Sequence, residues 1–170
     1  MNLRYFALLA SISLLPSGSF AGEKSHGHWS YEGKTGPADW GQLSEDYATC
    51  RSGEQQSPIN IGKMANGTAP NLLFSYHATP LNIIDNGHTL KVSVAPGNAV
   101  FLNGEEFVLK QFHYHTPSEH TIKGKHLPME IHFVHQSEKG ECLVVGVLVQ
   151  EGSDNSEYAK IIKHKPEHGK

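Results

Sequence analysis

Three histidines stand in two short segments, at spacings that suit a metal ion. The first segment, Gln111–His115, reads Gln-Phe-His-Tyr-His, and the second, Met129–His135, contains His132. If both segments are β-strands, alternation places His113 and His115 on one face of the first strand. A neighbouring strand would bring His132 to the same place. Three neutral imidazoles without a cysteine are the ligand set of a catalytic zinc site that keeps its fourth position open.

Each segment also carries a polar residue two positions before a histidine, and therefore on the same face. Gln111 precedes His113, and Glu130 precedes His132. A ligating imidazole usually donates its other N–H to an amide or carboxylate oxygen. A carboxylate that points into an apolar sheet is costly unless it is paired. These five residues favour a Zn²⁺ site. The alternative is that the histidines are ordinary core or surface residues, which would be the better reading for any one of them alone.

Most of the chain after residue 56 consists of short β-like runs separated by turn residues. Their alternation predicts a series of strands and one C-terminal helix. The expected strands are 72–76, 81–84, 89–94, 99–102, 106–115, 119–122, 129–135 and 143–149, and the expected helix is about 156–164. The run 143–149 is apolar on both faces, which favours a central strand. Residues 22–56 lack periodicity and predict an irregular segment anchored by Trp29, Tyr31 and Trp40. The whole predicts a single, mainly-β domain.

The N-terminus has the pattern of a signal peptide rather than of a folded element. Arg4 precedes an apolar run, and Ser19-Phe20-Ala21 places small residues where a signal peptidase cleaves. We therefore expect residues 1–21 to be removed and residues 22–170 to be exported, periplasmic or secreted. An uncleaved membrane anchor is the alternative, but no apolar run is long enough to span a bilayer. In an oxidising compartment Cys50 and Cys142 could form a disulfide, or Cys142 could be a core thiol.

The composition fits an ordinary globular protein with an excess of histidine. The chain has 170 residues, 12 of them His, and a formal net charge of -3. This charge gives no electrostatic reason to expect nucleic acid as a partner. The histidine content favours metal or proton chemistry.

Several motifs, in this order and spacing, resemble the α-class carbonic anhydrases. They are Trp29–Tyr31, Gln56–Ile61, Asn86–His88, Gln111–His115, Ser118–Thr121 and Glu130–His135. The resemblance runs from about His28 to the end of the sequence. It implies a large, mostly antiparallel central sheet, and it implies a fold that is incomplete at the C-terminus, because the family's last strands and its Ser-Leu-Thr-Thr-Pro-Pro motif do not occur here. In exported members the cysteine at the position of Cys50 pairs with one beyond that motif.

The resemblance also implies a reaction and a role for each matching residue. The reaction is the reversible hydration of carbon dioxide to bicarbonate and a proton by a zinc-bound hydroxide, which is a lyase activity with Zn²⁺ as cofactor. The implied roles are zinc ligation by His113, His115 and His132; orientation of these ligands by Gln111 and Glu130; proton shuttling by His88; orientation of the hydrogen-bond network by Glu119; an apolar wall for carbon dioxide at Val134 and Val144; and a water network at Tyr31. The family's Thr that partners Glu119 belongs to the motif not found here. The alternative is therefore a member that binds zinc but is catalytically impaired or inactive.

Overall fold

The structure is a computed structural model that describes residues 28–62, 67 and 70–167. Contacts divide the chain into two compact units, with a boundary between Ser57 and Pro58, and each unit is described by itself. Residues 1–21, the predicted signal peptide, lie outside the described residues. The assignment of residues 22–170 to one domain stays a prediction.

The unit that precedes Pro58 consists of single helical turns. These are η1 (Gly33–Thr35), α1 (Trp40–Leu43), η2 (Glu45–Tyr47) and α2 (Thr49–Ser52). Trp29, Tyr31 and Trp40 pack edge to face, with ring centroids 5.4 to 5.7 Å apart. The segment has no continuous periodicity, as expected, but its described residues contain four single helical turns that the sequence did not indicate. Helices of three or four residues are too short to show the helical periodicity on which the prediction relied.

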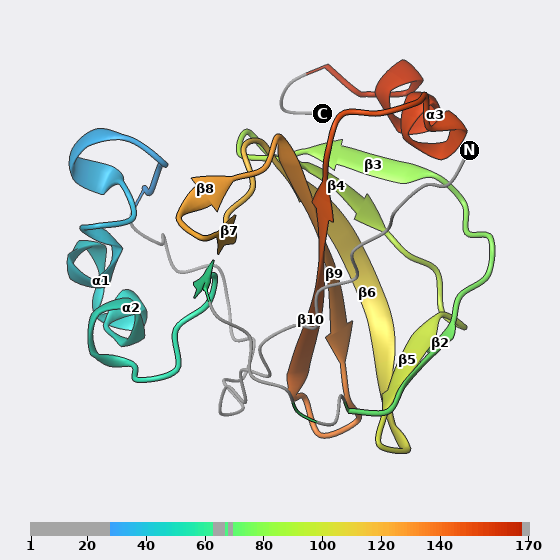
Figure 1. Cartoon of the computed structure of the whole chain (residues 1–170), viewed down its shortest axis with the longest axis horizontal. Coiled ribbons are helices and arrows are strands. Elements are labelled where there is room, and N and C mark those ends of the chain that lie inside the picture. Colours follow the sequence, from blue (N-terminus) through green and yellow to red (C-terminus); the bar gives the residue numbers. More distant parts are fainter. Residues whose placement is uncertain (1–27, 63–66, 68–69, 168–170) are drawn as a thin grey trace. The chain divides into compact units, whose positions relative to one another are not determined.

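The unit that begins at Pro58 is built on a large antiparallel sheet (Figure 1). Its strands follow the path β10-β9-β6-β4-β3, while β5 pairs with β6 and with β2. Their bounds are β2 Leu72–Ser75, β3 Asn82–Asp85, β4 Leu90–Ser93, β5 Ala99–Leu102, β6 Glu105–His115, β9 Met129–Gln136 and β10 Cys142–Val149. A smaller sheet joins β1 (Asn60–Ile61), β7 (Thr121–Ile122) and β8 (Lys125–His126). The predicted fold class, mainly β with a large and mostly antiparallel sheet, is confirmed.

One face of the large sheet carries an aromatic layer. Phe133 stacks with Tyr76 and lies against Phe112, with ring centroids 6.2 and 5.4 Å away. Helix α3 (Ser156–Lys163) contacts the same face, because its Tyr158 ring lies 5.4 Å from that of Tyr114. The side chain of Asn155 caps α3 by accepting from two backbone N–H groups of its first turn. The helix is confirmed to within one residue of its expected end.

A buried histidine lies within this aromatic layer. His135 is fully buried, and its Nδ1 lies 3.1 Å from the carbonyl oxygen of Leu143. Its Nε2 lies 2.6 Å from the hydroxyl of Tyr76. The carbonyl can only accept, so Nδ1 carries the proton and Nε2 accepts from the tyrosine. Burial lowers the pKa of His135 and raises that of Tyr76 to about 12. This histidine is a structural residue on the face opposite His132.

A β-bulge in β6 decides which of its side chains face the histidine cluster. Leu109 pairs with His135, but Gln111 pairs with Val134, so Lys110 is the extra residue. Without the bulge, Leu109 and Gln111 would share a face. With it, Leu109 points to the aromatic layer and is buried, whereas Gln111 points to the face of the cluster. The sequence alternation alone did not indicate this switch.

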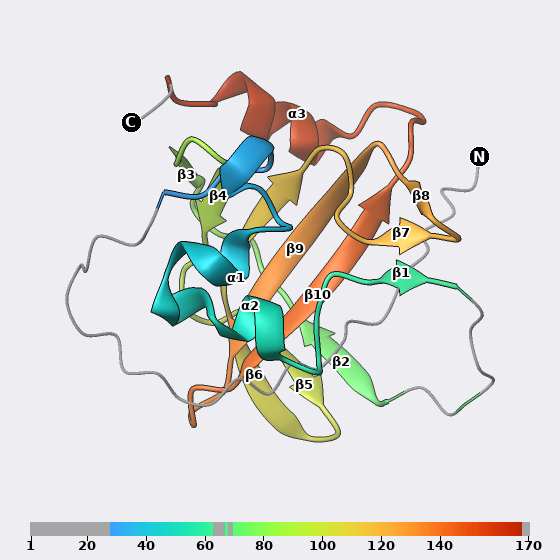
Figure 2. The same cartoon turned by 90° about the vertical axis from the view of Figure 1, so that its left-hand side faces the viewer.

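Two predictions about strands are wrong. The apolar strand β10 is not central: in the described part of the chain it pairs with β9 alone, at the edge of the sheet (Figure 2). An apolar strand indicates that both faces are covered, and it says nothing about the number of hydrogen-bonded neighbours. The strand expected at 119–122 is limited to Thr121–Ile122, because the N–H groups of Glu119 and His120 donate to Glu130 instead.

The two cysteines are not joined by a disulfide in this structure. Both Cys50 and Cys142 are free thiols, Cys50 exposed and Cys142 half-buried. Among the described residues there is no helix with the length and apolar character needed to cross a bilayer.

Candidate metal centre

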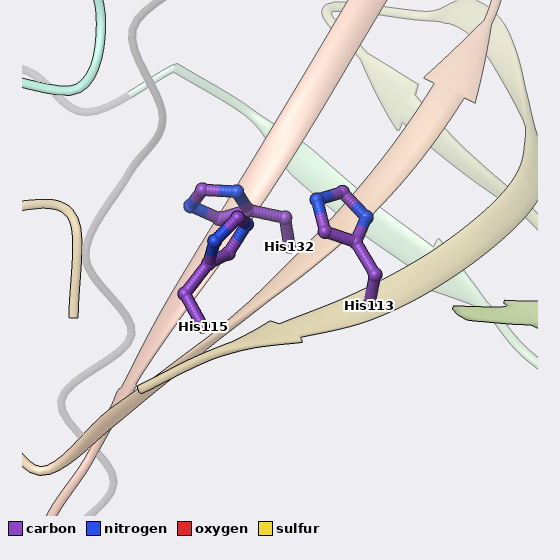
Figure 3. Close-up of side chains that lie close together, drawn as sticks. All are labelled: His113, His115 and His132. Carbon is purple, nitrogen blue, oxygen red and sulfur yellow. The ribbon is translucent and has the colours of Figure 1, made fainter. Parts of the chain in front are cut away.

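The pairing of β6 with β9 brings the three histidines together. His113 lies directly opposite His132, and His115 lies one pleat further along β6, opposite Glu130. The ring centroids are 4.6 to 5.4 Å apart. Each ring offers one nitrogen, and these three nitrogens lie within 4.8 Å of one another. Figure 3 shows the rings of His113 and His115 on one strand, with that of His132 facing them from the neighbouring strand.

Two of the rings are held by the polar residues expected from the sequence. The Oε1 of Gln111 lies 2.9 Å from Nδ1 of His113. The Oε1 of Glu130 lies 2.9 Å from Nε2 of His132. Both oxygens accept, so each holds the ring proton on the nitrogen that faces it. The other nitrogen, Nε2 of His113 and Nδ1 of His132, is then left with its lone pair for a metal ion.

Glu130 is a buried carboxylate with a full set of donors around it. Its side chain is 1% exposed. Its Oε2 accepts from the backbone N–H groups of Glu119 and His120, both at 2.9 Å, and its Oε1 lies 2.6 Å from Nδ1 of His120. Burial alone would raise the pKa of Glu130, but the hydrogen bonds from His120 and His132 outweigh it and hold the pKa well below its usual range. The residue is therefore charged and acts as a fixed acceptor.

His120 is a site residue that was not predicted from the sequence. It lies in the motif Ser118–Thr121, next to Glu119, but its role as a partner of Glu130 depends on a contact between distant parts of the chain. The signal that could have found it is Glu130 itself, because a buried carboxylate needs more than one donor.

The two histidines on β6 are neutral near pH 7. Burial, together with the charge of neighbouring imidazoles, lowers the pKa of His113 to about 4. The same causes lower the pKa of His115 to about 4. Neutral imidazole nitrogens are the form that binds zinc, copper or iron. An all-nitrogen, three-imidazole set without cysteine fits zinc in an open site, so the residues present suit the ion that the sequence predicts.

Glu119 points its carboxylate at the same cluster. Its Oε2 lies 3.3 Å from Nε2 of His115 and 3.7 Å from Nδ1 of His132. The side chain is 21% exposed. The resemblance implies that Glu119 orients a hydrogen-bond network, and that role stays a prediction. What the structure adds is direct proximity to two of the three candidate ligands.

The expected apolar wall lies on the face of the histidines. Val134 and Val144 are register partners across β9 and β10, and Val134 is two residues from His132. On the same face Gly146 pairs with His132. A Cβ at Gly146 would lie 2.9 Å from Oε1 of Glu130, so only glycine leaves room for that carboxylate.

His88 and Tyr31 lie outside β6 and β9, the two strands that carry the histidine cluster. His88 is exposed in the turn before β4, where its N–H donates to the side chain of Asn86. The next residue, Thr89, accepts from the backbone N–H of Tyr114, between the two histidines of β6. The turn is therefore tied to the strand that carries the cluster. Tyr31 belongs to the other unit, so its expected place in the site stays a prediction.

Comparisons with known proteins agree with the site. A family model described as eukaryotic-type carbonic anhydrase matches residues 35–167. A carbonic anhydrase of Pectobacterium atrosepticum is 41% identical over 159 residues, which are 93% of this chain and 65% of that protein. Among solved structures, the α-carbonic anhydrase of Thermovibrio ammonificans, in complex with the inhibitor sulfanilamide, superposes with a TM-score of 0.79 at 41% identity, over 85% of this chain and 65% of that one.

A second solved structure gives the same result. It is a hyperthermostable carbonic anhydrase from an active hydrothermal vent chimney, with a TM-score of 0.80 at 45% identity, and it covers 84% of this chain and 64% of that one. The chain thus spans just under two thirds of the length of these relatives. The family model alone covers well over half of the chain, and the chain therefore belongs to the eukaryotic-type carbonic anhydrase family.

Proposed function

We propose that this chain binds one Zn²⁺ through His113, His115 and His132 and forms the catalytic centre for the reversible hydration of carbon dioxide to bicarbonate and a proton. The observation that carries the proposal is the convergence of three imidazoles from two paired strands. Membership of the carbonic anhydrase family supports the choice of reaction.

In carbonic anhydrases, bound zinc lowers the pKa of a coordinated water molecule to about 7 and so supplies a nucleophile at neutral pH. The chain's own contribution begins with the geometry of the ligands. Gln111 and Glu130 keep the ring protons of His113 and His132 on the nitrogens that face away from the metal. These two rings therefore present a lone pair toward the metal.

The side chains beside the cluster suit a small apolar substrate. Carbon dioxide carries no charge and is a weak hydrogen-bond acceptor, so an apolar surface next to the reacting position is sufficient to hold it. Val134 and Val144 provide such a surface on the face of the histidines.

The reaction also releases a proton, which must reach solvent. His88 is exposed and has the side chain whose ordinary pKa lies nearest to neutral pH. Its turn is tied to β6 through Thr89. We propose that His88 accepts the proton and passes it to buffer.

Stopped-flow measurement of carbon dioxide hydration on the zinc-loaded protein tests the proposal. The His115→Ala protein should lose the catalysed rate, whereas His77→Ala, which removes an exposed imidazole away from the cluster, should keep it. Equal rates in the wild-type and His115→Ala proteins would overturn the proposed activity. Zinc binding without hydration in the wild-type protein would favour the alternative, a zinc-binding member without catalysis.

We also propose that the protein is exported to the periplasm or secreted, because Arg4, the apolar run and Ser19–Ala21 have the order of a signal peptide. N-terminal sequencing of the protein recovered from expressing cells should show a chain that begins at Gly22. An intact Met1 in protein recovered from the cytoplasm would contradict export.

A further inference from the structure

A lysine stands beside the histidine cluster, on the face of the sheet that carries it. Lys91 of β4 is the register partner of His113 in β6. Residues directly opposite one another in an antiparallel pair share a face and lie close together. Because His113 is in turn opposite His132, these three side chains form one row across three neighbouring strands.

This lysine has no acidic partner. Among the described residues, no ion pair or side-chain hydrogen bond involves Lys91. Its other register partner, Ile84 of β3, is apolar, and Asp85 is opposite Leu90 on the other face of the sheet. Lys91 is half-buried, so its ammonium group is only partly solvated and is stabilised by an anion that binds beside it.

The positive charge of Lys91 acts on the cluster. Burial is the main cause of the lowered pKa of His113, and the charges of His115, His132 and Lys91 lower it further. An ammonium group that disfavours a positive charge at His113 favours a negative charge at the same place, because the sign of the interaction follows the sign of the second charge.

The charges around the three histidines are arranged asymmetrically. The carboxylate of Glu119 lies 3.3 Å from Nε2 of His115 and 3.7 Å from Nδ1 of His132, whereas Lys91 lies beside His113. The cluster therefore has an acidic side and a basic side. A small anion is repelled on the first and attracted on the second, so the two charges together define where it binds.

We infer that Lys91 forms a subsite for a small inorganic anion next to the metal position, and that this anion is bicarbonate. The inference rests on the proposed function, in which bicarbonate is the product of hydration and the substrate of the reverse reaction. Carbon dioxide carries no charge. The lysine therefore increases the affinity of the site for bicarbonate and leaves its affinity for carbon dioxide unchanged.

Titration of bicarbonate into the cobalt-substituted protein tests this inference without measuring catalysis, because an anion that reaches the metal changes the visible spectrum of Co²⁺. Lys91→Gln should raise the dissociation constant for bicarbonate about 3–10-fold, between the effects of losing an exposed and a buried ion pair. Lys91→Arg keeps the charge and should keep most of the affinity. Lys163→Gln makes the same change of charge at an exposed position on α3, which contacts the opposite face, and should match the wild type.

Imidazole, which is a neutral ligand at slightly alkaline pH, should bind equally well to all of these proteins. Equal dissociation constants for bicarbonate in the wild-type and Lys91→Gln proteins would overturn the inference and leave the metal centre intact. Weaker binding of both bicarbonate and imidazole to Lys91→Gln would also overturn it, because the metal site would then be distorted. If Lys91→Gln fails to fold, Lys91→Met takes its place. A wild-type protein that takes up no Co²⁺, or that takes it up equally well after His115→Ala, would overturn both proposals.

Discussion

Replacing Glu130 by Gln tests the support of the histidine cluster most sharply, because the change keeps the shape of the side chain but exchanges an acceptor for a donor. Two backbone N–H groups meet Oε2, and the rings of His120 and His132 meet Oε1. In either orientation of the amide, its NH₂ group faces two N–H donors, either the two backbone groups or the two imidazoles. If it faces the imidazoles, His132 can accept only by moving its proton to Nδ1, the nitrogen that a metal needs.

The magnitude follows from the contacts that are lost. A hydrogen bond to a charged group contributes about 1.5–3 kcal/mol, and two of the four lose their acceptor. Glu130 is 1% exposed, so water does not replace them. We expect Glu130→Gln to lower the free energy of unfolding by about 3–5 kcal/mol, the cost of breaking a buried ionic contact. Zinc affinity should fall about 10–100-fold, as when other partners of a metal-binding histidine are removed.

Two assays measure these effects separately. Urea unfolding of the metal-free protein gives the stability, and competition with a chromophoric chelator gives the zinc affinity of the folded protein. Glu138→Gln makes the same chemical change at an exposed position and should alter neither. Wild-type values for Glu130→Gln in both assays would refute the view that a charged, buried carboxylate organises this site.

Three further predictions follow from neighbouring features. Gly146→Ala places a Cβ 2.9 Å from Oε1 of Glu130, so urea unfolding should show a loss of about 1–3 kcal/mol from overpacking; unchanged stability would contradict the close contact. Burial lowers the pKa of His135 below its unfolded value of 6.5, so below pH 6.5 the unfolded chain binds more protons than the folded chain. The pKa values of His113 and His115 are lowered as well, so urea unfolding curves of the metal-free protein should show stability falling as the pH drops below 6.5, with each of the three histidines contributing up to about 1.4 kcal/mol per pH unit; stability that does not change below pH 6.5 would contradict the lowered pKa values. His88→Ala should reduce turnover about 100-fold in weak buffer, with recovery in imidazole buffer, and wild-type turnover in weak buffer would exclude His88 as the proton carrier.

The histidine cluster could be predicted from sequence because it depends on strand alternation and on one pairing. His113 and His115 share a face in any regular strand, and the register of β6 with β9 then places His132 opposite His113. Gln111 and Glu130 followed from the same alternation. The bulge at Lys110 lies just before Gln111, so it did not affect the predicted positions of the histidines. It does place the β6 residues before it on the opposite face from the one that regular alternation would give.

The remaining features depend on long-range contacts that no local pattern shows. The backbone at Glu119 and His120 leaves the strand because Glu130 competes for its N–H groups. The edge position of β10 reflects its partners rather than its apolar composition. The position of the Glu119 carboxylate could not be predicted for a similar reason, because only the folded chain brings it close to His115 and His132.

The central claim is that three imidazoles of one chain hold one Zn²⁺, and zinc content after exhaustive dialysis tests it most directly. The wild-type and His77→Ala proteins should each retain one zinc ion per chain. His113→Ala, His115→Ala and His132→Ala should each retain far less under the same conditions. A wild-type protein without zinc, or a His115→Ala protein that retains as much zinc as the wild type, would contradict the claim.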